Sequence, residues 1–188
     1  MTKNNLKIKA IILVAFAFIG IWLVSSYNGV ISKLEEVNNK FAIIDTQLQR
    51  RADLIPNLVN TVKGYANQEQ EVIKLVTDAR EKLAGASSIE QKAEANEGLT
   101  NALNKLMLIV ENYPNLKSSQ NFIQLSDEIA GTENRIAVAR KDYNDAVRNY
   151  NLKIKKFPTN ILANIFGYEI QDYFEASEES QEVPSVDF

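Results

Sequence analysis

The chain has 188 residues, of which 45% are hydrophobic and 24% charged, and its formal net charge is −3. It contains no histidine and no cysteine, which excludes a Ser–His–Asp triad, a thiol nucleophile, a disulfide and an ordinary zinc, haem or iron–sulfur site. Only eleven glycines and prolines are present, too few for the many tight turns of a β-sandwich or barrel. We therefore expect an all-α protein with no metal and no cofactor.

The first predicted element is a single membrane-spanning helix over residues 10–27. Ala10–Val24 is an unbroken run of fifteen apolar residues, and a helix over the full segment reaches ~27 Å, about the thickness of a hydrocarbon core. Three lysines and no acid precede the run, so the positive-inside rule predicts a cytoplasmic segment 1–9 and export of the remaining chain. A cleaved signal peptide fits the same features and is the alternative.

The exported part, residues 28–188, is acidic. Without the three lysines that precede the apolar run, it has 18 basic and 24 acidic residues, a net charge of −6. Nucleic-acid binding needs a basic face that neutralises phosphates. We therefore expect no nucleic-acid partner.

Two interleaved seven-residue tracks begin at Val30. They consist of Val30, Val37, Ile44, Arg51, Leu58, Tyr65, Val72 and Ala79, and of Leu34, Phe41, Leu48, Ile55, Val62, Glu69, Val76 and Leu83. The register does not slip at Pro56, which predicts one helix over residues 30–84 with a kink at the proline. A helix-breaking turn at Asp53–Pro56 is the alternative.

Two charged residues, Arg51 and Glu69, interrupt these tracks. Each is either a buried, paired charge or a position where the apolar stripe reaches solvent. The solvent interpretation fits Glu69 better, and both interpretations stay open for Arg51.

Two further helices are predicted. Gly85 fits a C-terminal cap, and Ser87 opens the next helix as the N-cap of a Ser-x-x-Glu capping box. That helix is expected over residues 88–113. The last one is expected over residues 118–157, where large residues recur every seven positions: Phe122, Ile129, Ile136, Tyr143, Tyr150 and Phe157.

These helices predict a long antiparallel up-and-down bundle over residues 28–157, with three or possibly four helices. A coiled coil that assembles with copies of itself is the alternative, because seven-residue spacing does not distinguish packing within a chain from packing between chains.

Residues 158–188 form the predicted tail. An apolar piece at 160–168 is expected to pack on the bundle or to lie on a lipid surface. Residues 169–188 hold seven acids and no base, so most of this stretch is expected to be disordered. The last six residues regain apolar character and fit docking into a partner as an added strand or by capture of the carboxylate.

The candidate contact residues for protein partners lie around Pro56, in the loop after the second bundle helix and at the C-terminus. They are Arg50, Arg51, Asp53, Pro56, Asn57, Asn112, Tyr113, Pro114, Val183, Val186 and Phe188. A kinked helix and a capped turn would explain the first two groups without any partner.

The chain closely resembles the LemA family of bacterial membrane-anchored proteins. The residues that carry the resemblance include 47–59 (QLQRRADLIPNLV), 111–117 (ENYPNLK), 139–144 (ARKDYN) and 183–188 (VPSVDF). The resemblance implies an anchor in the bacterial cytoplasmic membrane with a short cytoplasmic start and an exported helical bundle. It implies no enzyme activity.

The expected function is that of a non-enzymatic, membrane-anchored envelope scaffold that binds itself or other envelope proteins through its bundle and C-terminal motif. One alternative is a lipid- or peptide-binding bundle in which Tyr143, Tyr150 and Phe157 line a groove.

A remote alternative is a hydrolase that uses paired carboxylates, either Asp142 with Asp145 or Glu133 with Asp127. Such chemistry needs a cleft that raises the pKa of one carboxyl. No catalytic residue is therefore assigned.

Overall fold

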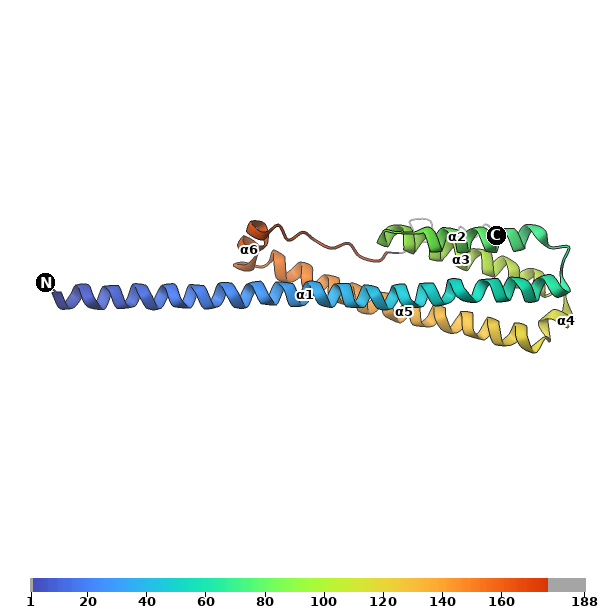
Figure 1. The fold of residues 1–188 in the computed structure, drawn as a ribbon, viewed down its shortest axis with the longest axis horizontal. Helices are drawn as coiled ribbons and strands as arrows, with labels where there is room; N and C mark the ends of the chain where they lie inside the picture. Colours follow the sequence, from blue (N-terminus) through green and yellow to red (C-terminus); the bar gives the residue numbers. More distant parts are fainter. Residues whose placement is uncertain (1, 176–188) are drawn as a thin grey trace, which may run out of the picture. The chain divides into compact units, whose positions relative to one another are not determined.

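The computed structural model describes residues 2–175, with side chains from residue 7 onward. The helices in chain order are α1 (Thr2–Tyr65), α2 (Gln70–Gly85), α3 (Ile89–Val110), α4 (Pro114–Lys117), α5 (Gln120–Lys155) and α6 (Thr159–Phe166) (Figure 1). The described range contains no strand, which confirms the predicted all-α class. It divides into unit 1, residues 2–39 and 145–171, and unit 2, residues 40–144 and 172–175.

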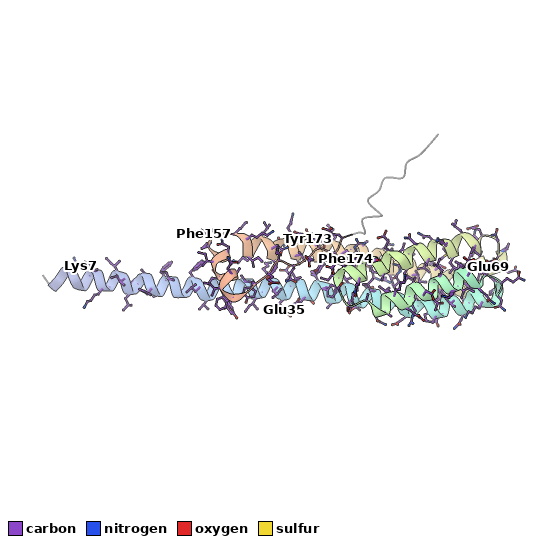
Figure 2. The ribbon with its side chains drawn as sticks, turned by 90° about the horizontal axis from the view of Figure 1, so that it is seen from above. Lys7, Glu35, Glu69, Phe157, Tyr173 and Phe174 are labelled. Carbon is purple, nitrogen blue, oxygen red and sulfur yellow. The ribbon has the colours of Figure 1, made fainter. Side chains whose placement is uncertain are left out.

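Residues 8–24, which we refer to as the first part of α1, have no described element of unit 1 packed beside them (Figure 2). Its apolar side chains are exposed, with Phe16 at 72% and Phe18 at 74%. An 18-residue window of this helix has a mean hydropathy of 2.4, and none of that window is buried. A helix that is apolar on all sides suits lipid better than water, so this part of α1 is long and apolar enough to cross a membrane.

The packed part of unit 1 begins at Ser26, the first buried residue of α1. Val30 and Val37 on α1 are buried, as are Tyr150 and Ile154 on α5. Valines seven residues apart on one helix face the same direction, so they form the stripe that the sequence predicted.

Unit 2 contains four long helical segments: residues 40–65 of α1, α2, α3 and residues 120–144 of α5. Its fully buried side chains include Ile44, Ile55, Leu58, Val76, Leu99, Leu106, Ile136 and Tyr143. All four segments contribute to this set, so unit 2 has the four-helix core that the sequence left as its second possibility.

Polar contacts fix the helix directions in unit 2. Lys40 pairs with Asp142 at 3.1 Å, and Arg135 Nε donates to Gln47 Oε1 at 3.1 Å. The residue number rises along α1 while it falls by the same seven positions along α5, so these two segments are antiparallel, as predicted.

The predicted single helix over residues 30–84 is wrong. The helix begins at Thr2, passes through Pro56 and ends at Tyr65, and α2 starts only at Gln70. The alternative break at Asp53–Pro56 is also wrong. Gly64 and Asn67 are weak helix formers that favour the observed turn. The seven-residue register survived because α1 and α2 face the same core, which their buried residues Leu58 and Val72 share.

The other predicted boundaries shift by a few residues. Ser88, not Ser87, is the N-cap of α3, because its side chain accepts from Gln91 N at 3.2 Å and closes a capping box with Gln91. Gly85 is the last residue of α2, and the C-cap is Ala86 in extended conformation. α3 ends at Val110 and α5 spans Gln120–Lys155, shorter than predicted at both ends.

Candidate functional site

Arg51 is a buried, paired charge in the core of unit 2. The residue is 2% exposed, and its guanidinium forms an ion pair with Glu133 of α5. Arg51 Nη1 also donates to Asn96 Oδ1 of α3 at 2.6 Å. Arg51, the heptad position for which both interpretations stayed open, therefore connects α1 with α3 and α5 through its guanidinium.

The environment of Arg51 opposes its charge. Burial lowers the pKa of the Arg51 guanidinium from its ordinary value, and the Glu133 carboxylate partly offsets this by favouring the charged form. Arg51 Nε is buried without a hydrogen-bond partner. A buried ion pair as a whole adds little to the free energy of unfolding, whereas removing one partner leaves an uncompensated buried charge.

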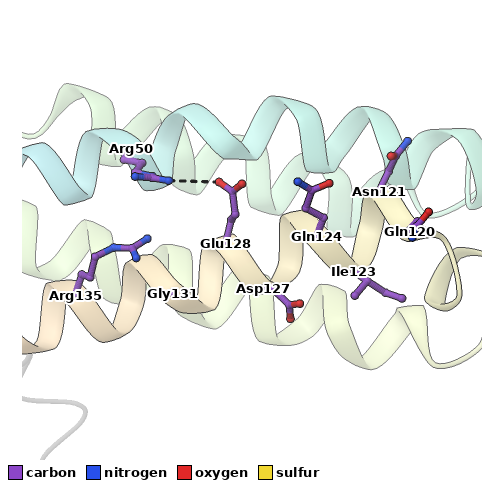
Figure 3. A pocket seen from close by; sticks show the side chains of 9 residues that line it. All are labelled: Arg50, Gln120, Asn121, Ile123, Gln124, Asp127, Glu128, Gly131 and Arg135. Carbon is purple, nitrogen blue, oxygen red and sulfur yellow. Dashed lines mark ion pairs between the residues drawn. The ribbon is translucent and has the colours of Figure 1, made fainter.

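Arg50, the residue before Arg51 on α1, is exposed and borders an open hollow of about 620 Å³ (Figure 3). Its Nη2 lies 3.7 Å from Glu128 Oε2 of α5. Arg135 and Asp127 line the same hollow. It therefore presents both charge signs to solvent and has no enclosed apolar floor of the kind that small-molecule sites use.

A side chain of α2 replaces the hydrogen bond that the proline in α1 cannot make. Pro56 has no N–H and cannot bond the carbonyl four residues earlier, that of Ala52. Arg80 Nε donates to this Ala52 oxygen at 3.3 Å. The helix can therefore continue through Pro56 without leaving the buried carbonyl unsatisfied.

The turns that end α1 and α3 meet through Glu69 and Tyr113. Tyr113 Oη donates to Glu69 Oε1 at 2.7 Å, and this hydrogen bond to a carboxylate raises the pKa of the Tyr113 hydroxyl. Glu69 is the N-cap position of α2 and is half-buried, so it is not the solvent-facing heptad residue that the sequence favoured.

In unit 1, Tyr150 and Asn151 of α5 hold the extended segment after α6. Asn151 Nδ2 donates to the Gln171 carbonyl, and Gln171 N donates back to Asn151 Oδ1, each at 2.9 Å. Tyr150 Oη donates to the Glu169 carbonyl at 3.0 Å. One side-chain amide thus satisfies both main-chain groups of a single residue, as a neighbouring strand would.

Unit 2 repeats this arrangement seven residues earlier on α5. Asn144 exchanges the same two hydrogen bonds with the backbone of Phe174, at 3.2 and 2.9 Å. Tyr143 Oη donates to the Asp172 carbonyl at 2.9 Å. We refer to these two Tyr-Asn pairs as the tail clamps. Residues 169–174 are therefore ordered, whereas the disorder predicted for residues 176–188 lies outside the described residues.

The tyrosines of the tail clamps do not line an open groove. Tyr143 is 0% and Tyr150 1% exposed, whereas Phe157 is 80% exposed. The proposed aromatic groove formed by these three residues is therefore wrong. Burial, with a smaller contribution from nearby carboxylates, raises the pKa of Tyr143 to about 12 and shifts the pKa of Tyr150 in the same direction.

Three of the four carboxylates considered for a hydrolase form ion pairs. Asp142 pairs with Lys40, Asp145 with Arg148, and Glu133 with Arg51. Asp127 borders the open hollow. Within the described range, no group of three His, Cys, Asp or Glu residues is placed to hold a metal ion.

The predicted contact residues are distributed over unit 2. Arg50, Asp53, Pro56 and Asn57 are exposed on α1, and only Arg51 is buried. Asp53 accepts from Gln49 on its own helix at 2.8 Å. Asn112 and Pro114 are exposed and Tyr113 is half-buried at the end of α3. The C-terminal candidates Val183, Val186 and Phe188 lie outside the described residues.

Sequence reasoning missed the tail clamps. Their signal was present as the dipeptide Tyr-Asn repeated at 143–144 and 150–151. The tyrosines of both dipeptides belong to the predicted apolar track, whereas the adjacent asparagines, which bind the peptide backbone, have no place in that pattern.

These features define an all-helical bundle protein with one N-terminal helix that could cross a membrane. The LemA family model matches residues 40–188. The chain belongs to the LemA family, which confirms the resemblance seen in the sequence.

Curated relatives include proteins from three bacteria. The chain is 30% identical over 179 residues to magnetosome protein MamQ 1 of Paramagnetospirillum magneticum, covering 81% of this chain and 66% of the relative. It is 29% identical over 178 residues to magnetosome protein MamQ of Magnetospirillum gryphiswaldense, covering 81% and 65%. It is 30% identical over 148 residues to protein LemA of Metamycoplasma hominis, covering 76% and 66%. The chain thus spans about two thirds of the length of these relatives.

Proposed function

We propose that this chain is a non-enzymatic scaffold of the bacterial envelope, anchored as a single-pass protein in the cytoplasmic membrane. Residues 10–27 cross the bilayer, residues 1–9 stay in the cytoplasm, and the helical bundle lies on the exported side. There it binds copies of itself or other envelope proteins.

The observation that carries this proposal is the bare first part of α1. Large apolar side chains such as Leu13 and Phe16 are 71% and 72% exposed. In water this surface would cost about 25 cal/mol for each Å² of apolar area. A bilayer removes that cost, and the basic residues before the run favour a cytoplasmic N-terminus.

The absence of histidine and cysteine supports a binding role over catalysis. The proposed contact surface consists of the exposed residues Arg50, Asp53 and Asn57 on α1, with Asn112 and Pro114 at the end of α3. The C-terminal residues 183–188 are proposed as a second contact element, because an apolar segment that follows an acidic stretch suits docking on a partner as an added strand.

Chemical cross-linking in intact cells, followed by mass spectrometry of the purified chain, tests the proposal. We expect cross-links to a second copy or to envelope proteins, recovered from the membrane fraction. The triple variant Arg50→Ala, Asp53→Ala, Asn57→Ala should lose a subset of them, because these exposed side chains can be truncated without opening the core.

A matched control is Lys74→Ala with Asp78→Ala, which removes an exposed ion pair on α2 that the proposal does not use. Its cross-links should match those of the wild-type chain. A chain recovered from the soluble fraction, or a monomer without any cross-linked neighbour, would contradict the proposal. A shortened N-terminus in the mass spectrum would support the cleaved signal peptide instead.

A further inference from the structure

α6 in unit 1 has a second apolar face that no described element of that unit covers. Its first face is packed, with Leu162 and Ala163 buried. Ile161 and Ile165, one turn apart on α6, are 51% and 70% exposed, and Phe157, two residues before the helix, is 80% exposed. Clustered large apolar side chains on a surface mark an interaction site, whereas scattered ones do not.

This apolar face lies level with the end of the apolar run of α1. The rings of Phe166 and Tyr27 have centroids 5.0 Å apart, and the ring of Tyr168 lies 6.3 Å from Tyr27. Tyr27 comes three residues after Val24, a rise of ~4.5 Å along the helix. The end of α6 therefore lies beside the end of the segment proposed to cross the membrane.

The charges beside α6 favour a lipid surface as the occupant. Lys155 and Lys156 at the end of α5 are exposed. Lys153 folds against α1, where a Cβ at Gly29 would lie 3.4 Å from its Cε. Basic residues flanking a short apolar helix suit a bilayer interface that contains anionic headgroups.

Gly167 ends α6 as its C-cap. Its φ of 71° is in the left-handed region, which glycine adopts without strain, and Tyr168 N then bonds the Ala163 carbonyl at 2.9 Å. The chain thus turns back toward α5 directly after Phe166.

We propose that α6 is an interfacial foot. In this arrangement, Phe157, Ile161 and Ile165 enter the boundary between headgroups and acyl chains, and Lys155 and Lys156 contact anionic headgroups of the same leaflet. The inference rests on the proposed function, because it requires residues 10–27 to cross that bilayer. The foot would give unit 1 a second point of contact with the membrane, in addition to the spanning helix, and would restrict the orientation of unit 1 relative to the membrane surface.

Spin labelling of the full chain in vesicles tests this directly, since the chain has no native cysteine. Ile165→Cys reports on the foot, Phe16→Cys on the span, and Val138→Cys, 64% exposed on α5, on water. Each labelled variant is placed in phosphatidylcholine vesicles with and without phosphatidylglycerol. Collision with oxygen and with a water-soluble nickel chelate is then measured.

We expect the label at 165 to collide with oxygen in preference to nickel, as the label at 16 does, and the label at 138 to show the reverse. Phosphatidylglycerol should increase the depth of the label at 165 in the bilayer, and the double variant Lys155→Gln, Lys156→Gln should abolish this increase in depth. The matched control is the double variant Lys74→Gln, Lys117→Gln at two exposed lysines, which should leave the increase in depth unchanged.

If the nickel chelate reached the label at 165 as readily as the label at 138, while the label at 16 stayed in lipid, the proposed foot would be wrong. The proposed membrane anchor would remain supported. Protection of 165 from both reagents would show that protein covers this face, and would also overturn the inference. Nickel access at 16 would contradict the proposed function, and the foot would fall with it.

Discussion

The two parts of α1 use apolar residues in opposite ways. In residues 8–24, apolar side chains point in every direction and are exposed, as for Leu13 at 71%. From Val30 onward, apolar residues follow a seven-residue repeat, and Val30, Ile44 and Leu58 are 1%, 0% and 0% exposed. One helix therefore contains two different patterns of apolar residues, one apolar on all sides and one with a single apolar stripe.

The difference shows why a run of apolar residues does not by itself identify a protein core. An amphipathic stripe needs a protein partner on one side only, and leaves the other side polar. A helix that is apolar around its whole circumference has no such partner among the described residues and suits a bilayer. The transition falls at Ser26, the first buried residue of α1.

The largest expected effect comes from charging the first part of α1. Phe16→Arg with Ile19→Arg should release the chain from the membrane fraction, because each arginine near the centre of a span costs about 2.5–3.5 kcal/mol of insertion free energy. Carbonate extraction followed by immunoblotting measures this. Ile43→Arg, at a position 42% exposed in the second part, is the matched control and should stay membrane-bound.

Removing the partner of Arg51 should have the next largest effect. Glu133→Ala leaves a buried guanidinium without its counter-ion, and should lower the free energy of unfolding by about 3 kcal/mol, at the low end of the range for buried pairs. Glu133 is 39% exposed on its side chain, so water can replace part of the interaction. Urea denaturation measures the loss.

The double variant Arg51→Met, Glu133→Leu should recover most of that stability, because it removes both charges from the bundle. If Glu133→Ala left the free energy of unfolding unchanged, the ion pair would have no role in holding α1 and α5 together.

A smaller effect is expected at Pro56. Pro56→Ala restores an N–H that can bond the Ala52 carbonyl, and should raise the free energy of unfolding by about 1–3 kcal/mol. Arg80→Met should cost about 1–2 kcal/mol in the wild-type chain but much less in Pro56→Ala, since the carbonyl then has another donor. A double-mutant cycle measures this coupling. Additive effects would show that Arg80 does not compensate for the proline.

The smallest effect concerns Tyr143, whose ring packs 5.9 Å from that of Phe41 on α1. Its pKa is raised to about 12, above the value of ~10 for an unfolded chain. The folded state thus holds this proton more tightly. The resulting stability is present below pH ~10 and is lost as pH rises toward 12.

Tyr143→Phe should cost about 1 kcal/mol at neutral pH by removing the hydrogen bond to Asp172, and should flatten the decline between pH 10 and 12. Denaturation across this range measures both. The same alkaline decline in Tyr143→Phe as in the wild-type chain would assign the pH dependence to other groups.

The sequence predicted the helical class, the apolar span and the core positions from Val30 to Val62 correctly. It placed the turn after α1 wrongly because Val72 and Leu83 of α2 continue the same seven-residue register toward the same core. The break at Asp53–Pro56 stayed open as the alternative because the sequence did not reveal that Arg80 would bond the freed Ala52 carbonyl.

The tail clamps could not be predicted from the same patterns. Asn144 and Asn151 bind main-chain atoms, so their partners in the tail carry no sequence signature. The burial of Arg51 stayed open for a related reason. Its partners Asn96 and Glu133 lie on other helices, and their proximity depends on how those helices pack.

A cysteine scan of α1 with a water-soluble maleimide on native membranes tests most directly whether its two parts have different surroundings. Residues 11–24 should all be unreactive, without periodicity. Beyond residue 30, reactivity should alternate, with Ile31 and Ile43 reactive, at 40% and 42% exposed, and their neighbours Val30 and Ile44 protected, at 1% and 0%. A one-sided, helical pattern of reactivity within residues 11–24 would show that this segment packs against protein, and would contradict the account.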